Sequence, residues 1–460
     1  MTDTQVASGK APTRSNVGLF AAVSIGVGGM IGAGIFSILG VVATISGSAL
    51  AVSFAVGGFV AALAAYSYAK LGSRYPSAGG SVQFLVEGLG DGLLTGTLNI
   101  FQYIAYIISI ALYAAGFAGY AMTFTPDGTP SWVQKGFSVG VVVAFTGLNF
   151  LGSRAMGRAE SIIVAIKVAI LVVFIAAGLF FIEPSRLAVS TWPNGIDILF
   201  GAGVLFIGYE GFGLITNAAG DMANPKRELP RALYLSVAIV IVIYVLVAIT
   251  VIGNLSLPAL ESAKDYALAE AAEPFLGQFG FKLIAIAALL STSSAVNATL
   301  FGAANVSYQI ARDGELPAVF TRSLWSRHVE GLFITAGLSC LFVLAFDLGP
   351  IAMMASAAFL IVYAAVNIAH LRVRRETKAM PAIIVASCTA CVAMFVLLMV
   401  YIVGNAPAAA WITLLAALMV AFVIEVLYRR HTGRRFRRLS EQHPAPPTAT
   451  ATATATAAVT

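Results

Sequence analysis

Charged side chains are scarce in this chain of 460 residues. Lys, Arg, Asp and Glu together make up 10% of it and hydrophobic residues 59%, whereas a soluble domain carries about 25% charged residues. The three cysteines (Cys340, Cys388 and Cys391) lie in apolar runs, so no disulfide framework is indicated. This composition excludes a secreted disulfide-rich protein and a nucleic-acid-binding module. It indicates a protein that crosses a membrane several times.

Motifs for nucleotide hydrolysis and for catalysis are also missing. The chain has no Gly-x4-Gly-Lys-Ser/Thr loop, so nothing in it supports the use of ATP. It has no repeated filter loop of the kind that an ion channel needs. Its four histidines, which we expect to be solvated, are His328, His370, His431 and His443. We therefore expect no enzymatic activity, no cofactor and no metal.

Long apolar runs dominate the sequence instead. A membrane-spanning helix needs about 20 mostly apolar residues, and twelve stretches qualify. They lie roughly at 17–45, 49–70, 92–122, 133–151, 160–182, 196–219, 231–254, 281–311, 331–348, 350–371, 381–403 and 408–428. The sequence therefore predicts an all-α membrane protein with 12 transmembrane helices.

Basic residues are distributed unevenly between the two sides of the membrane. With a cytosolic N-terminus, four of the 27 Lys and Arg residues fall on the opposite side, Lys167 falls inside a span, and all others are cytosolic. The four are Lys135, Arg186, Lys264 and Lys282. This asymmetry predicts a multi-pass protein of the cytoplasmic membrane with both termini in the cytosol. The net charge of +6 then follows from topology and gives no reason to expect a nucleic-acid partner.

Two predicted spans carry glycine clusters at mid-depth. The first span has five glycines within 26–34, and the sixth has three within 208–213, around Glu210. Glycine destabilises a helix by about 1 kcal/mol relative to alanine, and non-helical backbone at membrane depth occurs only where it is buried or lines a cavity. The alternative is that the glycines serve close helix packing. Because the clusters fall in helices 1 and 6, they predict a five-plus-five inverted repeat with broken helices 1 and 6.

Interrupted helices expose backbone groups of both polarities. Amides at a helix N-terminus attract a carboxylate, and freed carbonyls attract an ammonium group. An α-amino acid carries both groups a few ångströms apart. The two interruptions therefore predict an amino-acid site built mainly from backbone.

Three motifs resemble those of the amino acid–polyamine–organocation (APC) superfamily. They are Gly-Met-Ile-Gly-Ala-Gly-Ile-Phe at 29–36, Asn-Pro-Lys-Arg-Glu-Leu-Pro-Arg at 224–231 and Ala-Arg-Asp-Gly-Glu-Leu-Pro at 311–317. Their order and spacing match the family over essentially all of 15–430. The resemblance implies alternating access for amino acids or amines. It also implies a transport core of helices 1–10 at 15–372 and peripheral helices 11 and 12 at 373–430. The basic residues predict cytosolic tails at 1–14 and 431–460, and the second of these, which ends in a Thr-Ala alternation without an apolar face, is predicted to be disordered.

By this resemblance, the substrate lies between the two glycine clusters. Its carboxylate lies on the amides of residues 32–34, and its amine on the carbonyls of Met30, Ile207 and Glu210. Ile207 stands where arginine/agmatine exchangers of the family place a stacking tryptophan, which favours smaller neutral substrates. The predicted substrate site comprises Met30, Ile31, Gly32, Ala33, Gly34, Phe206, Ile207, Glu210 and Gly211.

Aromatic residues near this site have two interpretations. Phe206 and Phe212 flank the predicted break in helix 6, while Tyr103 and Tyr106 lie on the third span. Tyr103, Tyr106 and Phe212 are candidate gating residues. Ordinary packing within the helix bundle is the alternative for all four.

Lys167 is the one charged residue in the stretch 162–181 and lies about 9 Å inside its cytosolic end. A charge at this depth costs a few kcal/mol, although a lysine can also snorkel towards the head groups. The resemblance favours a functional role, because a subgroup of proton-coupled APC permeases carries a helix 5 lysine in place of the sodium ion of sodium-coupled relatives. A protonated Lys167 would join helix 1 carbonyls at 26–29 to hydroxyls of helix 8, with Ser293 and Ser294 as candidates. Release of the proton would free helix 1.

Two questions remain open at this level. Glu210 has three candidate roles: holding the helix 6 break, contacting a cationic substrate, or moving protons. Transport by proton symport is the leading prediction, and exchange of amino acids or amines without proton coupling is the alternative. The expected partners are an amino-acid substrate, protons and the lipid bilayer, with the oligomeric state left open.

Overall fold

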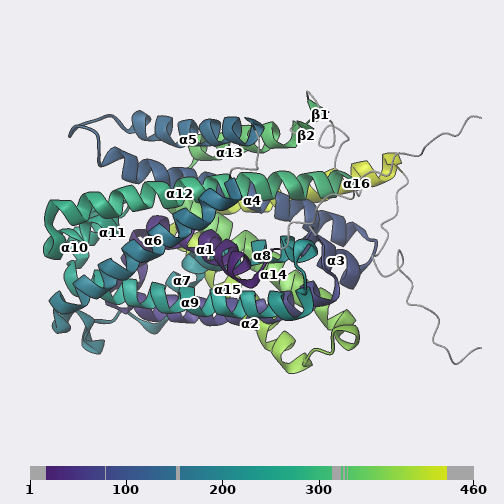
Figure 1. The fold of residues 1–460 in the computed structure, drawn as a ribbon, viewed down its shortest axis with the longest axis horizontal. Coiled ribbons are helices and arrows are strands. Elements are labelled where there is room, and N and C mark those ends of the chain that lie inside the picture. The colour runs from purple at the N-terminus through teal and green to yellow at the C-terminus, as the bar shows by residue number, and fades with distance from the viewer. Residues whose placement is uncertain are drawn as a thin grey trace, which may run out of the picture.

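The computed structural model describes residues 17–77, 79–151, 156–312, 323–324, 327–328 and 330–432. These residues are almost entirely helical, as predicted for an all-α membrane protein (Figure 1). Nine segments of the described chain are long and apolar enough to cross a membrane, and one of them, Leu19–Arg74, contains two consecutive helices. A shorter apolar helix, Gly331–Ala345, adds to these. The exact number of twelve spans stays a prediction.

The helices follow one another with short connections. The first half contains α1 (Leu19–Ser46), the 3-10 turn η1 (Gly47–Ala49), α2 (Leu50–Arg74), α3 (Ser81–Leu89), α4 (Leu93–Met122), α5 (Ser131–Leu151), α6 (Met156–Gly178) and the 3-10 turns η3 (Leu179–Phe181), η4 (Pro184–Leu187) and η5 (Val189–Thr191). The second half begins with α7 (Gly195–Leu205), the 3-10 helix η6 (Phe206–Phe212), α8 (Gly213–Asn217), η7 (Ala219–Asp221), α9 (Pro225–Asn254), α10 (Leu257–Ser262) and α11 (Ala267–Glu270). It continues with α12 (Glu273–Arg312), the antiparallel pair β1 (Ser323–Leu324) and β2 (Arg327–His328), α13 (Glu330–Ala345), α14 (Leu348–Thr377), α15 (Pro381–Asn405) and α16 (Ala408–Thr432).

Helices at equivalent positions in the two halves pack against each other. α2 lies along α9, α4 along α12 and α5 along α13, while α1 contacts α7 and η6. Figure 1 shows α5 and α13 together along one edge of the bundle and α2 and α9 along the opposite edge. In the order of the predicted spans, α1 is helix 1, α2 helix 2, α4 helix 3, α5 helix 4 and α6 helix 5. The segment α7–η6–α8 is helix 6, α9 helix 7, α12 helix 8, α13 helix 9 and α14 helix 10. The contacts therefore pair helix 1 with 6, 2 with 7, 3 with 8 and 4 with 9. Such pairing is what two inverted five-helix repeats produce.

Burial separates the central helices from the outer ones. The apolar windows of α4 and α14 are 83% buried, whereas those of α15 and α16 are 28% buried. The exposed apolar faces of α15 and α16 suit contact with lipid tails. α16 is nevertheless fixed to α4 at one end: the carboxylate of Glu425 fills the space beside Gly96, and Arg429 forms an ion pair with Asp91.

The predicted interruption of helix 1 is wrong, because α1 is a single α-helix from Leu19 to Ser46. The prediction that His370 is solvated is also wrong. α14 continues to Thr377, so His370 is fully buried, with its Nδ1 2.9 Å from the hydroxyl of Ser67 and its Nε2 2.9 Å from that of Thr377. Residues 313–317 of the third family motif and both predicted tails, except for 431–432, lie outside the described residues.

Candidate functional site

The glycines of α1 bring three helices into close contact. A Cβ atom added at Gly34 would lie 2.7 Å from the Cα of Gly208 in η6, and one at Gly32 would lie 2.6 Å from the Cβ of Ala295 in α12. Side chains cannot approach so closely, so only glycine fits at these positions. Close packing therefore explains why α1 stays helical despite its glycines, since the packing gained offsets their poor helix propensity.

Helix 6 does change its geometry at the predicted place, by tightening into η6. The hydroxyl of Ser356 in α14 accepts a hydrogen bond from the amide of Ile207 at 2.9 Å and donates one to the carbonyl of Val204 at 2.6 Å. A side chain inserted into the hydrogen-bond ladder is a recognised cause of a local change in a helix. The 3-10 stretch then runs from Phe206 to Phe212 and contains Glu210.

Lys167 donates a hydrogen bond from its Nζ to the carbonyl of Gly28 at 2.8 Å. Its residue is 1% exposed, so the ammonium group is inside the protein and does not snorkel to the membrane surface. α6 and α1 both pack against α12, which carries Ser294 as a buried residue and Ser293 as a half-buried one. Lys167 thus connects α6 to the middle of α1.

Two further side chains donate to neighbouring carbonyls of α1. The hydroxyl of Tyr244 in α9 lies 2.5 Å from the carbonyl of Met30 and 3.1 Å from that of Gly208. The hydroxyl of Ser291 in α12 donates to the carbonyl of Ile31 at 2.7 Å. Donors from α6, α9 and α12 therefore converge on one turn of α1, at 28–31, where the predicted substrate site begins.

Glu210 is buried among tyrosines. The residue is 2% exposed, and the hydroxyl of Tyr363 donates to its backbone carbonyl at 3.1 Å. Phenol groups from α2, α4 and α14 lie within electrostatic reach of the carboxylate: those of Tyr68, Tyr106, Tyr113 and Tyr363. The carboxylate and these phenols form a polar cluster inside an otherwise apolar part of the bundle.

The aromatic residues at the two ends of η6, Phe206 and Phe212, pack on the same tyrosine. The ring of Phe212 stacks on Tyr363 with centroids 5.3 Å apart and meets Tyr68 edge-on at 5.4 Å. Phe206 meets Tyr363 edge-on at 5.6 Å. Tight packing therefore accounts for the positions of both phenylalanines in this conformation.

The two tyrosines predicted on helix 3 point to different neighbours. Tyr106 packs edge-on against Phe359 at 5.4 Å, close to Glu210. The hydroxyl of Tyr103 lies 2.8 Å from that of Thr335 in α13. Tyr106 therefore belongs to the cluster around η6, whereas Tyr103 joins α4 to α13.

Tyr244, Ser356 and Tyr363 were not identified from the sequence as site residues. Each is a polar residue within a long apolar run. A lone polar residue at membrane depth needs a partner, so its position in the sequence already indicates a buried polar contact. The sequence does not reveal their partners, because these lie far away along the chain. The separation is 36 residues for Tyr244 and Gly208, and more than 150 residues for the contacts with Met30, Val204 and Glu210.

The fold and this site define a polytopic membrane transporter with polar side chains gathered at the middle of α1 and at η6. The family model for amino acid permeases matches residues 17–424. The chain belongs to this amino acid permease family, within the APC superfamily.

Individual relatives agree with the family. The chain is 42% identical over 426 residues to an uncharacterized protein of Methanocaldococcus jannaschii, covering 91% of this chain and 96% of the relative. It is 34% identical over 417 residues to the inner membrane transport protein YbaT of Escherichia coli, covering 90% and 96%. It is 30% identical over 378 residues to a mitochondrial cationic amino acid transporter of Arabidopsis thaliana, covering 76% and 61%. These matches support amino acid transport as its activity.

Proposed function

We propose that this protein is a secondary active amino acid permease of the cytoplasmic membrane that works by alternating access and proton symport, with both termini cytosolic. The observation that carries the proposal is the buried hydrogen bond of 2.8 Å from Lys167 to the carbonyl of Gly28. An ammonium group held away from water next to the substrate helix is a functional candidate by default. Residues 15–372 form the transport core in this proposal, and helices 11 and 12 at 373–430 are peripheral.

Substrate binding requires α1 to open at its centre. In an α-helix the carbonyls of Gly28, Met30 and Ile31 accept hydrogen bonds from the amides four residues further on. Each of these carbonyls already has a second donor, in Lys167, Tyr244 and Ser291 respectively.

Opening this turn would therefore leave the three carbonyls satisfied. It would release the amides of Gly32, Gly34 and Ile35, two of which lie in the predicted carboxylate site. An unsatisfied buried carbonyl costs about 1–3 kcal/mol, so the three donors lower the cost of opening. The substrate carboxylate can then bind the freed amides at the new helix N-terminus.

Proton coupling follows from the charge of Lys167. While protonated, its ammonium group binds the carbonyl of Gly28 and ties α1 to α6. When it releases its proton, the remaining amine is a weaker donor and the tie is loosened. Protonation and the movement of α1 are then linked, which lets a proton gradient drive amino acid uptake.

Two features bear on the choice of substrate. Ile207 stands where the arginine/agmatine exchangers of the superfamily place a stacking tryptophan, which favours smaller neutral amino acids. The backbone groups of α1 and η6 recognise the amino and carboxylate groups that all α-amino acids share. Exchange without net proton coupling is the second candidate, since a tied α1 also suits obligatory counter-transport.

Uptake of a labelled amino acid panel into proteoliposomes, with and without a pH gradient, tests the proposal. We expect accumulation that follows the gradient in the parent protein and is lost in Lys167→Met, which keeps the length of the side chain and removes its charge. Lys282→Met, an exposed lysine of α12, is the matched control and should accumulate substrate like the parent.

Counterflow separates the two transport modes. Lys167→Met should still exchange internal for external substrate, because exchange needs no net proton movement. Gradient-driven accumulation that persists in Lys167→Met would remove the proposed role of Lys167. Counter-transport that is insensitive to pH in the parent protein would favour the exchanger.

A further inference from the structure

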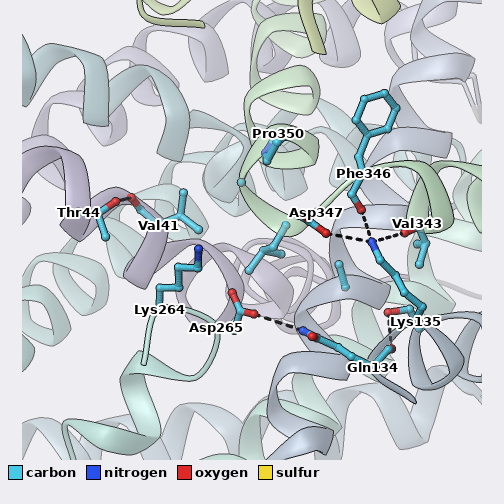
Figure 2. A pocket seen from close by; sticks show the side chains of 14 residues that line it. Val41, Thr44, Gln134, Lys135, Lys264, Asp265, Val343, Phe346, Asp347 and Pro350 are labelled. Atoms are coloured by element: carbon cyan, nitrogen blue, oxygen red, sulfur yellow. Dashed lines mark hydrogen bonds and ion pairs between the residues drawn. The ribbon is translucent and has the colours of Figure 1, made fainter. Parts of the chain in front are cut away.

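A cavity lies at the C-terminal end of α1, away from Gly32 and Gly34. It has a volume of about 430 Å³ and is lined by α1, α4, α5, the loop between α10 and α11, and the α13–α14 junction (Figure 2). This volume is within the range of about 300–1,000 Å³ that is typical of small-molecule sites. Val41 of α1 lines it and lies about 10 Å along the helix from Gly34. The cavity is therefore separate from the proposed substrate site.

Charged groups of both signs face this cavity. Lys135 is already occupied: its Nζ donates to the carbonyl of Val343 at 2.8 Å and to that of Phe346 at 2.6 Å, and it pairs with Asp347 at 3.1 Å. These contacts place its charge at the C-terminal end of α13, where a cation stabilises exposed carbonyls. Lys135 thus has a structural role at the wall of the cavity.

Lys264 and Asp265 differ from Lys135 in this respect. The carboxylate of Asp265 accepts a hydrogen bond of 3.2 Å from the neutral side chain of Gln134. Within the described parts of the chain, Lys264 forms no hydrogen bond or ion pair, and its side chain is exposed to the cavity. Figure 2 shows the two side chains next to each other at the cavity. They supply one cation and one anion that no opposite charge among the described residues neutralises at salt-bridge distance.

The loop that carries Lys264 and Asp265 packs tightly against two helices at the wall of the cavity. A Cβ atom at Gly40 of α1 would collide with the backbone of Lys264, and one at Gly119 of α4 would lie 2.8 Å from the carbonyl oxygen of Asp265. The loop therefore sits directly on α1 and α4. A ligand held by Lys264 and Asp265 would contact a segment that packs against α1, the helix that carries Gly34.

We propose that this cavity is a second binding site for a zwitterionic α-amino acid, on the membrane side opposite the N-terminus. Lys264 binds the carboxylate, Asp265 binds the ammonium group, and the apolar side chains of Val41 and Leu348 contact the substrate side chain. This inference rests on the proposed amino acid transport. It adds a first station from which substrate reaches the helix 1–helix 6 site once the loop moves.

Protection from cysteine labelling tests the proposal. Thr44 of α1 lines the cavity and is exposed, so Thr44→Cys in a background with the three native cysteines replaced by alanine reports on its occupancy. We expect the transported amino acid, at ten times its Kd, to slow labelling by a membrane-impermeant maleimide about tenfold. Lys264→Gln and Asp265→Asn should each abolish this protection, whereas the control Lys282→Gln should retain it.

Uptake measured in the same vesicles separates this inference from the proposed function. Protection without uptake of any amino acid would overturn the transport proposal and leave the second site standing. Uptake without protection, or equal protection in both charge variants, would overturn the second site alone. Loss of both uptake and protection in the otherwise intact parent protein would overturn both.

Discussion

The hydroxyl group of Tyr244 lies 2.5 Å from the carbonyl oxygen of Met30. This hydrogen bond joins α9 to the middle of α1, at a carbonyl that a continuous helix would already satisfy through its own backbone. The same hydroxyl lies 3.1 Å from the carbonyl of Gly208 in η6. Tyr244 therefore links both halves of the substrate site to helix 7.

Tyr244→Phe removes this donor and keeps the ring. Opening of α1 would then leave the carbonyl of Met30 without a partner, at a cost of about 1–3 kcal/mol, so we expect uptake to slow by about tenfold or more. The fold should persist, which size-exclusion chromatography in detergent would check. Tyr234→Phe, at an exposed tyrosine of the same helix, is the control and should transport normally. Unchanged uptake in Tyr244→Phe would contradict the assisted opening of α1.

Gly34→Ala places a methyl group against η6. The added Cβ would lie 2.7 Å from the Cα of Gly208, and backbone atoms cannot move aside as a flexible side chain can. We expect the free energy of unfolding to fall by about 1–3 kcal/mol, as for other overpacked cores, measured as a lower melting temperature in detergent. Gly140→Ala in α5, where no atom lies within 4 Å, should instead be neutral or stabilising by up to about 1 kcal/mol. Equal melting temperatures for the two variants would show that α1 and η6 are not in tight contact.

Glu210→Gln tests which of its three roles the carboxylate has. Phenols from α2, α4 and α14 interact with it electrostatically, and Tyr363 donates a hydrogen bond to its backbone carbonyl, so we expect its main role to be holding η6 among these helices. Glutamine keeps the size and an acceptor oxygen. We therefore expect the ratio of cationic to neutral amino acid uptake to stay unchanged. Selective loss of cationic amino acid uptake would assign the carboxylate to the substrate instead, and loss of gradient dependence would assign it to proton movement.

Glu270 gives a pH-dependent prediction outside the membrane-spanning helices. Burial, followed by the nearby charge of Glu273, raises the pKa of Glu270 above its usual value. A raised pKa in the folded state means that the charged carboxylate destabilises folding, and that this loss sets in as the pH rises from the unfolded pKa through the folded one. Glu270→Gln should therefore melt slightly higher than the parent at neutral pH, with the difference vanishing below about pH 4. Glu261→Gln is the exposed control, and an equal rise there would point to a general charge effect.

The sequence predicted the class of the protein because that class depends on composition and on the lengths of apolar runs. It could not distinguish unwinding from close packing at 26–34, since both need residues without a side chain. The distinction depends on Gly208 and Ala295, which face α1 from distant segments. Hydroxyl partners such as Tyr244 and Ser356 were missed for the same reason. His370 was misjudged because its helix continues to Thr377, beyond the predicted apolar stretch.

The pairing of α2 with α9, α4 with α12 and α5 with α13 has an energetic consequence for the transport cycle. In the proposed alternating-access cycle the two halves exchange roles, so the two end states are built from equivalent contacts and are related by a pseudo-two-fold rotation. Equivalent contacts give the end states similar free energies. Under this proposal a modest ion gradient is then enough to bias the direction of net flux.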